Sequence, residues 1–98
     1  MLRITEEAVQ PFEKEHIDLV RKTAPECALF LKREDDTLPI ASGKVALYGS
    51  GARRTIKGGT GSGDVNVRHF VTVEEGLEHA GFEIMSKDWL DAYDQVMA

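Results

Sequence analysis

The chain has 98 residues, which suits one small domain or part of a larger one. Hydrophobic residues make up 42% and charged residues 30%, an ordinary globular composition that excludes a disordered chain. The net charge of −5 would repel a phosphate-rich polymer, so nucleic acid is not an expected partner.

The start of the chain carries no long apolar run, so we expect neither a signal peptide nor a membrane span there. The single cysteine, Cys27, cannot form a disulfide within the chain, which fits a reducing compartment. We therefore expect a cytoplasmic protein in which Cys27 is a small buried residue.

The histidines His16, His69 and His79 are far apart in sequence and predict no metal site.

Two helices are expected in the first third of the chain. Thr5 can cap a short helix, and Pro11 interrupts or restarts it. A stronger apolar stripe then recurs at steps of three and four, through Ile17, Val20, Ala24, Cys27 and Leu31. Pro25 lies inside this stripe, and Thr23 and Glu26 have the spacing of a capping box, so we expect a kink or a restart there.

Short strands are expected on both sides of a helix in the second half of the chain. Residues 34–42 read as a loop, with Leu38 to Ile40 packed on the core. The apolar runs 44–48, KVALY, and 82–85, FEIM, are typical of buried strands in a parallel sheet.

The helix between these strands is bounded by local signals. Thr72 and Glu75 form a capping box at its start, and Gly81 ends it. Ser86 is expected to cap a last helix, whose apolar side is formed by Trp89, Ala92, Tyr93 and Val96.

This order of elements predicts an α/β fold: a partial layered α/β/α domain with a short parallel sheet, helices on its faces and a long Gly-rich loop. We treat residues 1–98 as a single partial domain. Two parallel strands leave sheet faces uncovered, so the chain is expected either to be the front part of a larger domain or to form a homodimer.

The Gly-rich loop contains the stretch KGGTGSGDVNVR at residues 57–68. It does not fit a nucleotide site. The dinucleotide fingerprint needs a third glycine where the chain has Arg54, and again where it has Asn66. A P-loop needs a Gly-Lys-Ser/Thr triplet that the sequence lacks. No cofactor is therefore expected.

Asp64 is the carboxylate that stands out, because it follows Gly63 in a loop at the carboxyl end of a strand, where α/β sheets place ligands. A turn-forming aspartate bonded to backbone is the alternative for it.

Trp89 is expected in the core rather than as a platform for a sugar ring. Ser50 and Ser62 have no His–Asp partners that would make either a nucleophile.

Four stretches in order carry a resemblance to a known family: ECALFLKREDDTLPI, KVALYGSGA, KGGTGSGDVN and VTVEEGLEHAGFEI. Together they resemble the α/β domain of glycoside hydrolase family 3, the β-glucosidase family. The resemblance covers residues 15 to 94. In most members a TIM barrel comes first, so this chain resembles the N-terminal part of a member with reversed domain order.

The resemblance implies a retaining enzyme with two carboxyl groups, both supplied outside these residues. Lys87-Asp88-Trp89 superficially echoes the Ser-Asp-Trp motif of the nucleophile, but it opens a helix, whereas the family's motif ends a barrel strand. We therefore expect no catalytic residue in this chain, which should be inactive alone. A TIM-barrel domain of the same protein is the implied partner, and a β-glycoside is the implied substrate.

The resemblance also implies that the Gly-rich loop faces the barrel across the active-site cleft. The substrate-binding residues it suggests are Gly61, Ser62, Gly63, Asp64, Arg54 and Lys57. Residues 53–69 are expected to be mobile without the barrel. The alternative is a stand-alone α/β module that binds a small ligand through the same loop or acts in assembly.

Overall fold

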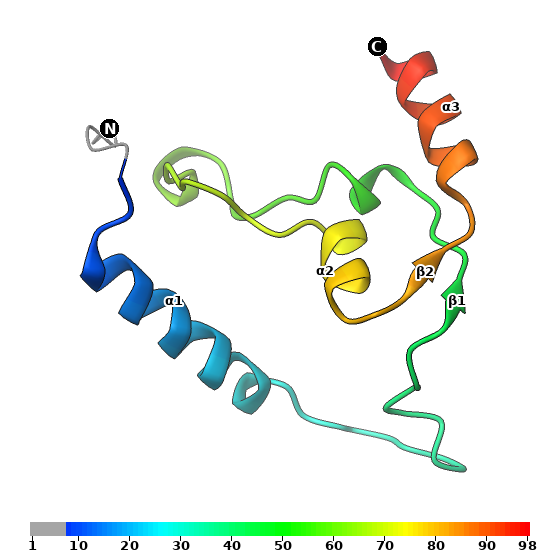
Figure 1. Cartoon of the computed structure of the whole chain (residues 1–98), viewed down its shortest axis with the longest axis horizontal. Coiled ribbons are helices and arrows are strands. Elements are labelled where there is room, and N and C mark those ends of the chain that lie inside the picture. Colours follow the sequence, from blue (N-terminus) through cyan, green and yellow to red (C-terminus); the bar gives the residue numbers. More distant parts are fainter. Residues whose placement is uncertain (1–7) are drawn as a thin grey trace. The chain divides into compact units, whose positions relative to one another are not determined.

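The structure is a computed structural model that describes residues 8–98 (Figure 1). Contacts group residues 8–40 into one unit and residues 41–98 into another. Thr5, where a short helix was predicted to begin, lies outside the described residues. The three α-helices and the small parallel sheet of the described part agree with a partial α/β fold.

Residues 8–40 contain α1 (Pro11–Thr23) and the 3₁₀ turn η1 (Ala24–Cys27). Pro11 is the first helical residue, where its missing N–H costs nothing. Glu13 closes a capping box by accepting a hydrogen bond from the backbone N–H of Gln10 at 2.6 Å. The predicted start of a helix at Pro11 is confirmed.

The predicted break at Pro25 is also confirmed, because α1 gives way to η1 there. The predicted capping box of Thr23 and Glu26 is wrong: Thr23 keeps a helical backbone, and its hydroxyl donates to the carbonyl of Leu19 at 2.8 Å. Cys27 is exposed, so its predicted burial is wrong.

The apolar stripe does not continue through a single helix to Leu31. The backbone becomes extended at Ala28, directly after η1, and the exposed fraction of Leu31 is 92%. Leu38 and Ile40, which were expected to pack on the core, are exposed as well. The apolar spacing predicted the helix correctly only up to Pro25, where the α-helix can no longer continue.

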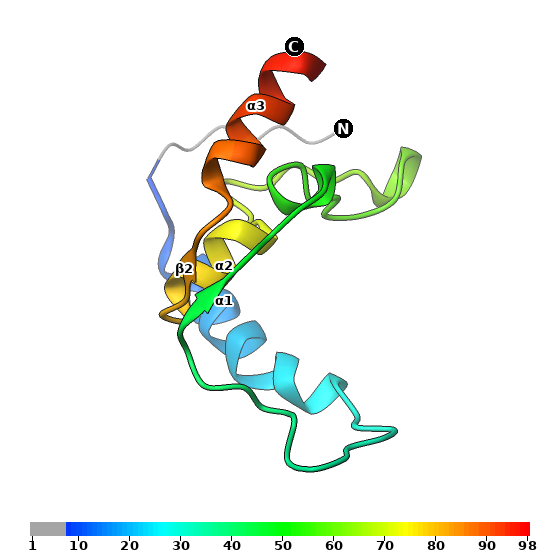
Figure 2. The same cartoon turned by 90° about the vertical axis from the view of Figure 1, so that its right-hand side faces the viewer.

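In residues 41–98, β1 (Lys44–Val45) pairs with β2 (Glu83–Ile84) in parallel, with Lys44 opposite Glu83 (Figures 1 and 2). The parallel pairing was predicted, but both strands are shorter than expected. The hydroxyl of Ser86 explains the end of the ladder: it accepts from the N–H of Leu47 at 2.7 Å and donates to the carbonyl of Leu47 at 2.5 Å. A side chain thus takes the place of the next strand residue.

The helix α2 (Val73–His79) has the predicted ends. The hydroxyl of Thr72 accepts from the N–H of Glu75 at 3.2 Å, which confirms the N-cap. Gly81 has a φ of +89° and donates to the carbonyl of Glu78, while Phe82 donates to Leu77, both at 3.0 Å. This is the Schellman arrangement that terminates helices at glycine.

The helix α3 (Lys87–Met97) is not capped by the side chain of Ser86, which bonds Leu47 instead. Leu90 is its one buried residue, at 2% exposed, and packs with Ala52 and Ile84 in the core. Trp89 is 42% exposed, so the expectation of a core tryptophan is wrong. Its ring stacks on Tyr93, with centroids 5.3 Å apart.

Among the residues that the structure describes, no helix has the length and apolar character needed to cross a membrane.

Candidate functional site

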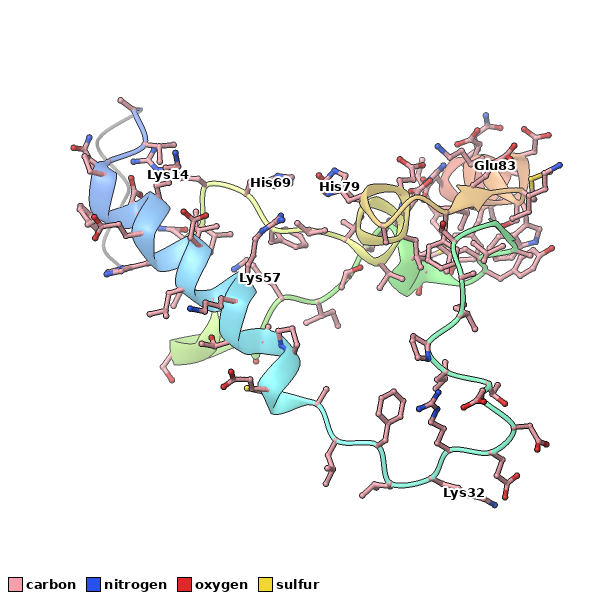
Figure 3. All side chains as sticks on the ribbon, turned by 60° about the horizontal axis from the view of Figure 1, so that its bottom comes forward. Lys14, Lys32, Lys57, His69, His79 and Glu83 are labelled. Carbon is pink, nitrogen blue, oxygen red and sulfur yellow. The ribbon has the colours of Figure 1, made fainter. Side chains whose placement is uncertain are left out.

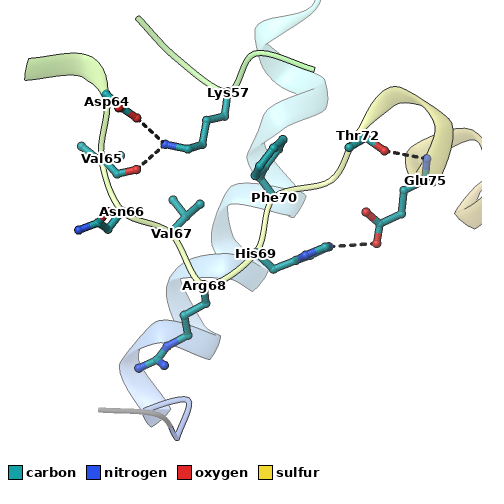
Figure 4. Close-up of a pocket in the computed structure, with 10 residues that line it drawn as sticks. All are labelled: Lys57, Asp64, Val65, Asn66, Val67, Arg68, His69, Phe70, Thr72 and Glu75. Carbon is teal, nitrogen blue, oxygen red and sulfur yellow. Dashed lines mark hydrogen bonds and ion pairs between the residues drawn. The ribbon is translucent and has the colours of Figure 1, made fainter. Parts of the chain in front are cut away.

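An open hollow of about 510 Å³ lies in the unit formed by residues 41–98 (Figure 4). Its walls come from the two ends of the glycine-rich stretch, the segment that follows it and the first turn of α2. The lining residues are Lys57, Asp64, Val65, Asn66, Val67, Arg68, His69, Phe70, Thr72 and Glu75.

Lys57 and Asp64 close the glycine-rich stretch at one side of this hollow. The ammonium of Lys57 lies 3.1 Å from a carboxylate oxygen of Asp64 and also donates to the carbonyl of Val65 (Figure 4). Gly58 approaches Gly63 so closely that a Cβ on Gly58 would stand 2.9 Å from the Gly63 carbonyl oxygen. The stretch is therefore a closed turn held by an ion pair and a close backbone contact.

Of the six binding residues predicted from the sequence, Lys57 and Asp64 line the hollow. Gly61, Ser62 and Gly63 form the 3₁₀ turn η3 (Gly61–Gly63) directly before Asp64, and Ser62 is exposed. They stand beside the hollow rather than in its lining.

Arg54 is placed elsewhere. Its guanidinium lies 3.6 Å from the carboxylate of Asp94 on α3, and it does not line the hollow. The structure therefore brings together Lys57 and Asp64 and leaves Arg54 outside their group.

Arg53, next to Arg54, joins two helices to the turn η2 (Ser50–Ala52) that follows β1. Its guanidinium binds both carboxylate oxygens of Glu74 at 2.7 and 3.1 Å, and it also reaches Asp91 at 2.6 Å and Asp94 at 3.1 Å. These hydrogen bonds raise the pKa of Arg53 above its ordinary range. Its charge is thus neutralised within the fold by three carboxylates, which argues against Arg53 as a ligand-binding residue.

A second contact lies close to the Arg53–Glu74 pair. The hydroxyl of Thr55 accepts from the N–H of Val73, the first residue of α2, at 3.1 Å. The residues before and after the glycine-rich region are therefore held together at their base.

Sequence reasoning missed His69 and Glu75. The imidazole Nε2 of His69 lies 3.0 Å from the carboxylate Oε1 of Glu75 (Figure 4). His79, one turn further along α2, lies 3.8 Å from the same oxygen (Figure 3 labels both histidines). Glu75 carried a sequence signal only as a capping residue. The spacing of the histidines gave no sign of a shared carboxylate, because it depends on the path of the chain into α2.

The chemistry of the hollow is that of hydrogen bonding. Its carboxylates, imidazole and ammonium supply donors and acceptors, and Phe70 and two valines supply apolar surface. Residues 8–98 contain no group of three His, Cys, Asp or Glu side chains suited to a metal ion. Binding of a polar organic ligand is the chemistry that these side chains support.

Two curated proteins share sequence with this chain. It is 40% identical over 76 residues to β-glucosidase A of Butyrivibrio fibrisolvens, an alignment that covers 76% of this chain. It is 41% identical over 71 residues to β-glucosidase B of Emericella nidulans, covering 67% of this chain. In its sequence, the chain is β-glucosidase-like.

The β-glucosidase-like chain spans about a tenth of the length of these relatives, with 9% of one and 8% of the other aligned. No family model and no solved structure matches it.

Proposed function

We propose that this β-glucosidase-like chain is part of a glycoside hydrolase and contributes one wall of its sugar site. The observation that carries the proposal is the identity of about 40% to two β-glucosidases over most of this chain. The wall is the closed turn at residues 57–64 with the hollow beside it. A carbohydrate, specifically a β-glycoside, is the proposed substrate.

The residues proposed to bind the sugar are the six predicted from sequence, and two groups of them differ in how they would act. Lys57 and Asp64 hold the turn closed and border the hollow. The exposed Ser62 stands at the tip of η3, where glycines on both sides leave room for a ligand. Sugar hydroxyls are bound by short, directional hydrogen bonds, which a hydroxyl and a carboxylate supply. Arg54 would take part only after leaving Asp94.

The chemical step is assigned to residues outside these 98. We propose a retaining family 3 enzyme in which a TIM-barrel domain of the same protein supplies the nucleophile, and in which this chain is inactive by itself. The α/β elements described here would then be the front of a layered α/β/α domain. A cytoplasmic location fits a chain with a single cysteine.

The test compares the 98-residue chain with the natural protein at its full length on a panel of aryl β-glycosides. We expect hydrolysis by the natural protein and none by the 98-residue chain. In the natural protein, Ser62→Ala should lower kcat/KM by about 3- to 10-fold, the effect of losing one uncharged hydrogen bond. Ser50→Ala, another exposed serine in a 3₁₀ turn, is the control and should have no effect. Equal kcat/KM for the two variants would show that Ser62 does not bind the substrate.

A second candidate function is assembly, in which the chain is a stand-alone module that forms a homodimer. Many large apolar side chains are exposed, among them Ile56, Leu31 and Val96. The test is sedimentation: a concentration-dependent dimer, together with no glycosidase activity in the natural protein, would favour assembly over the enzyme.

A further inference from the structure

We propose that His69 and Glu75 form a second sugar-binding element on the same hollow, selective for an uncharged, hydroxyl-rich ligand. The proposal deepens the glycoside hydrolase function and rests on it. Neither residue belongs to the glycine-rich turn. His69 stands in the segment that leads into α2, and Glu75 stands in the first turn of that helix (Figure 4).

The position of the His69–Glu75 pair is set by the backbone of Glu75. The backbone N–H of Glu75 is held by the hydroxyl of Thr72, so the carboxylate starts from a capped helical turn. The side chain of Glu75 is 31% exposed, and only Oε1 has hydrogen-bonding partners among the described residues. Oε2 remains available to accept a hydrogen bond from a ligand.

The contact with Glu75 also determines what His69 offers. A carboxylate only accepts hydrogen bonds, so the Nε2 of His69 must carry the proton that it donates to Glu75. In the neutral ring, Nδ1 is then an acceptor. With the ring neutral, Nδ1 and Oε2 are two acceptors on residues that line the hollow, which suits the donating hydroxyls of a sugar.

The charges around the hollow indicate what kind of sugar fits. Two cationic side chains, Lys57 and Arg68, and two anionic ones, Asp64 and Glu75, line it. The charges of the two signs balance, and Lys57 is paired with Asp64 at 3.1 Å, so the hollow has no surplus of positive charge for a phosphate or a sugar acid. Phe70 adds apolar surface against which the C–H face of a sugar ring can pack. A neutral hexose therefore fits better than its uronic acid.

His79 offers a matched control within the same cluster. It lies 3.8 Å from the same carboxylate oxygen as His69, but it does not line the hollow. Replacing either histidine removes an imidazole beside Glu75, and only His69 should matter for a ligand in the hollow.

The experiment uses the natural protein at its full length, with D-glucose and D-glucuronate as competitive inhibitors of aryl β-glucoside hydrolysis. We expect glucose to bind more tightly than glucuronate. His69→Ala should weaken glucose inhibition and raise KM by about 3- to 10-fold, with a smaller change in kcat. His79→Ala should change both by less than about 2-fold. Glu75→Gln keeps the side-chain size and the backbone N–H, so it tests the pair if His69→Ala fails to fold.

The outcomes separate this proposal from the one on which it rests. Hydrolysis with glucose inhibition equal in the two histidine variants would overturn the role of His69 and leave the glycoside hydrolase function standing. Tighter binding of glucuronate than of glucose would overturn the selectivity for an uncharged ligand. Absence of both hydrolysis and glucose binding in the natural protein would overturn the two proposals together.

Discussion

Lys57 and Asp64 stand at the two ends of the glycine-rich stretch, and their ion pair converts flexible sequence into a closed turn. Surface ion pairs alone stabilise proteins little. Here the pair acts together with the Lys57 bond to the Val65 carbonyl and with the contact of Gly58 against Gly63. At the scale of single residues, glycine is therefore needed at one particular position of the stretch.

Gly58→Ala should open the turn, because its new Cβ would lie 2.9 Å from the Gly63 carbonyl oxygen. We expect a loss of about 1 kcal/mol in the free energy that keeps the turn closed. Gly63→Ala is the matched control, since its Cβ would enter open space. Amide hydrogen exchange across residues 57–65 measures the difference, and equal exchange in the two variants would contradict the prediction.

The residues of the candidate site were predictable only where their signal is local. Lys57 and Asp64 flank a conspicuous glycine run, so sequence alone pointed to them. His69 and Glu75 meet because the chain turns into α2 between them, and no short pattern encodes that path. Arg54 was grouped with Lys57 by its place in the sequence, yet its guanidinium turns toward Asp94 on α3.

At the scale of elements, the two ends of α2 were predicted well because capping chemistry acts over three or four residues. Thr72 and Gly81 bound α2 as expected. The strands were predicted too long because their end depends on Ser86, a residue distant in sequence that bonds the backbone of Leu47. The same hydroxyl was expected to cap α3, and it cannot serve both purposes.

The C-terminal stop of α2 gives a prediction with an internal control. Gly81→Ala should destabilise the protein by about 1–2 kcal/mol, because a side chain disfavours its φ of +89°. Gly76→Ala in the same helix should be neutral or stabilising by up to about 1 kcal/mol, since its Cβ would make an ordinary 3.5 Å contact with Val71. Urea denaturation compares them, and a Gly81→Ala variant as stable as Gly76→Ala would refute the left-handed stop.

At the scale of the whole molecule, the described residues bury few apolar side chains. The core of residues 41–98 consists of Ala52, Ile84 and Leu90, with Val45, Leu47 and Leu77 packed around it. A core of this size supports only marginal stability. The sequence predicted an α/β pattern with uncovered sheet faces, but it did not show which few apolar side chains would be buried in this stretch on its own.

Leu90→Ala should abolish cooperative unfolding of the 98-residue chain, because such a truncation costs about 2–5 kcal/mol. Val96→Ala on the same helix is the control, since Val96 is 82% exposed and should leave the transition unchanged. Thermal unfolding followed by circular dichroism distinguishes them. A sharp transition retained in Leu90→Ala would show that the core lies elsewhere.

The contacts at the base of the glycine-rich region have an evolutionary consequence. The Arg53–Glu74 ion pair and the Thr55–Val73 hydrogen bond fasten the points where the chain leaves and re-enters the helical part. With both ends anchored, doubling the intervening length costs only about 0.6 kcal/mol of closure entropy. Insertions and deletions between Ile56 and Val71 can therefore accumulate at little cost to the fold, so any limit on the length of this region would come from ligand binding and not from folding.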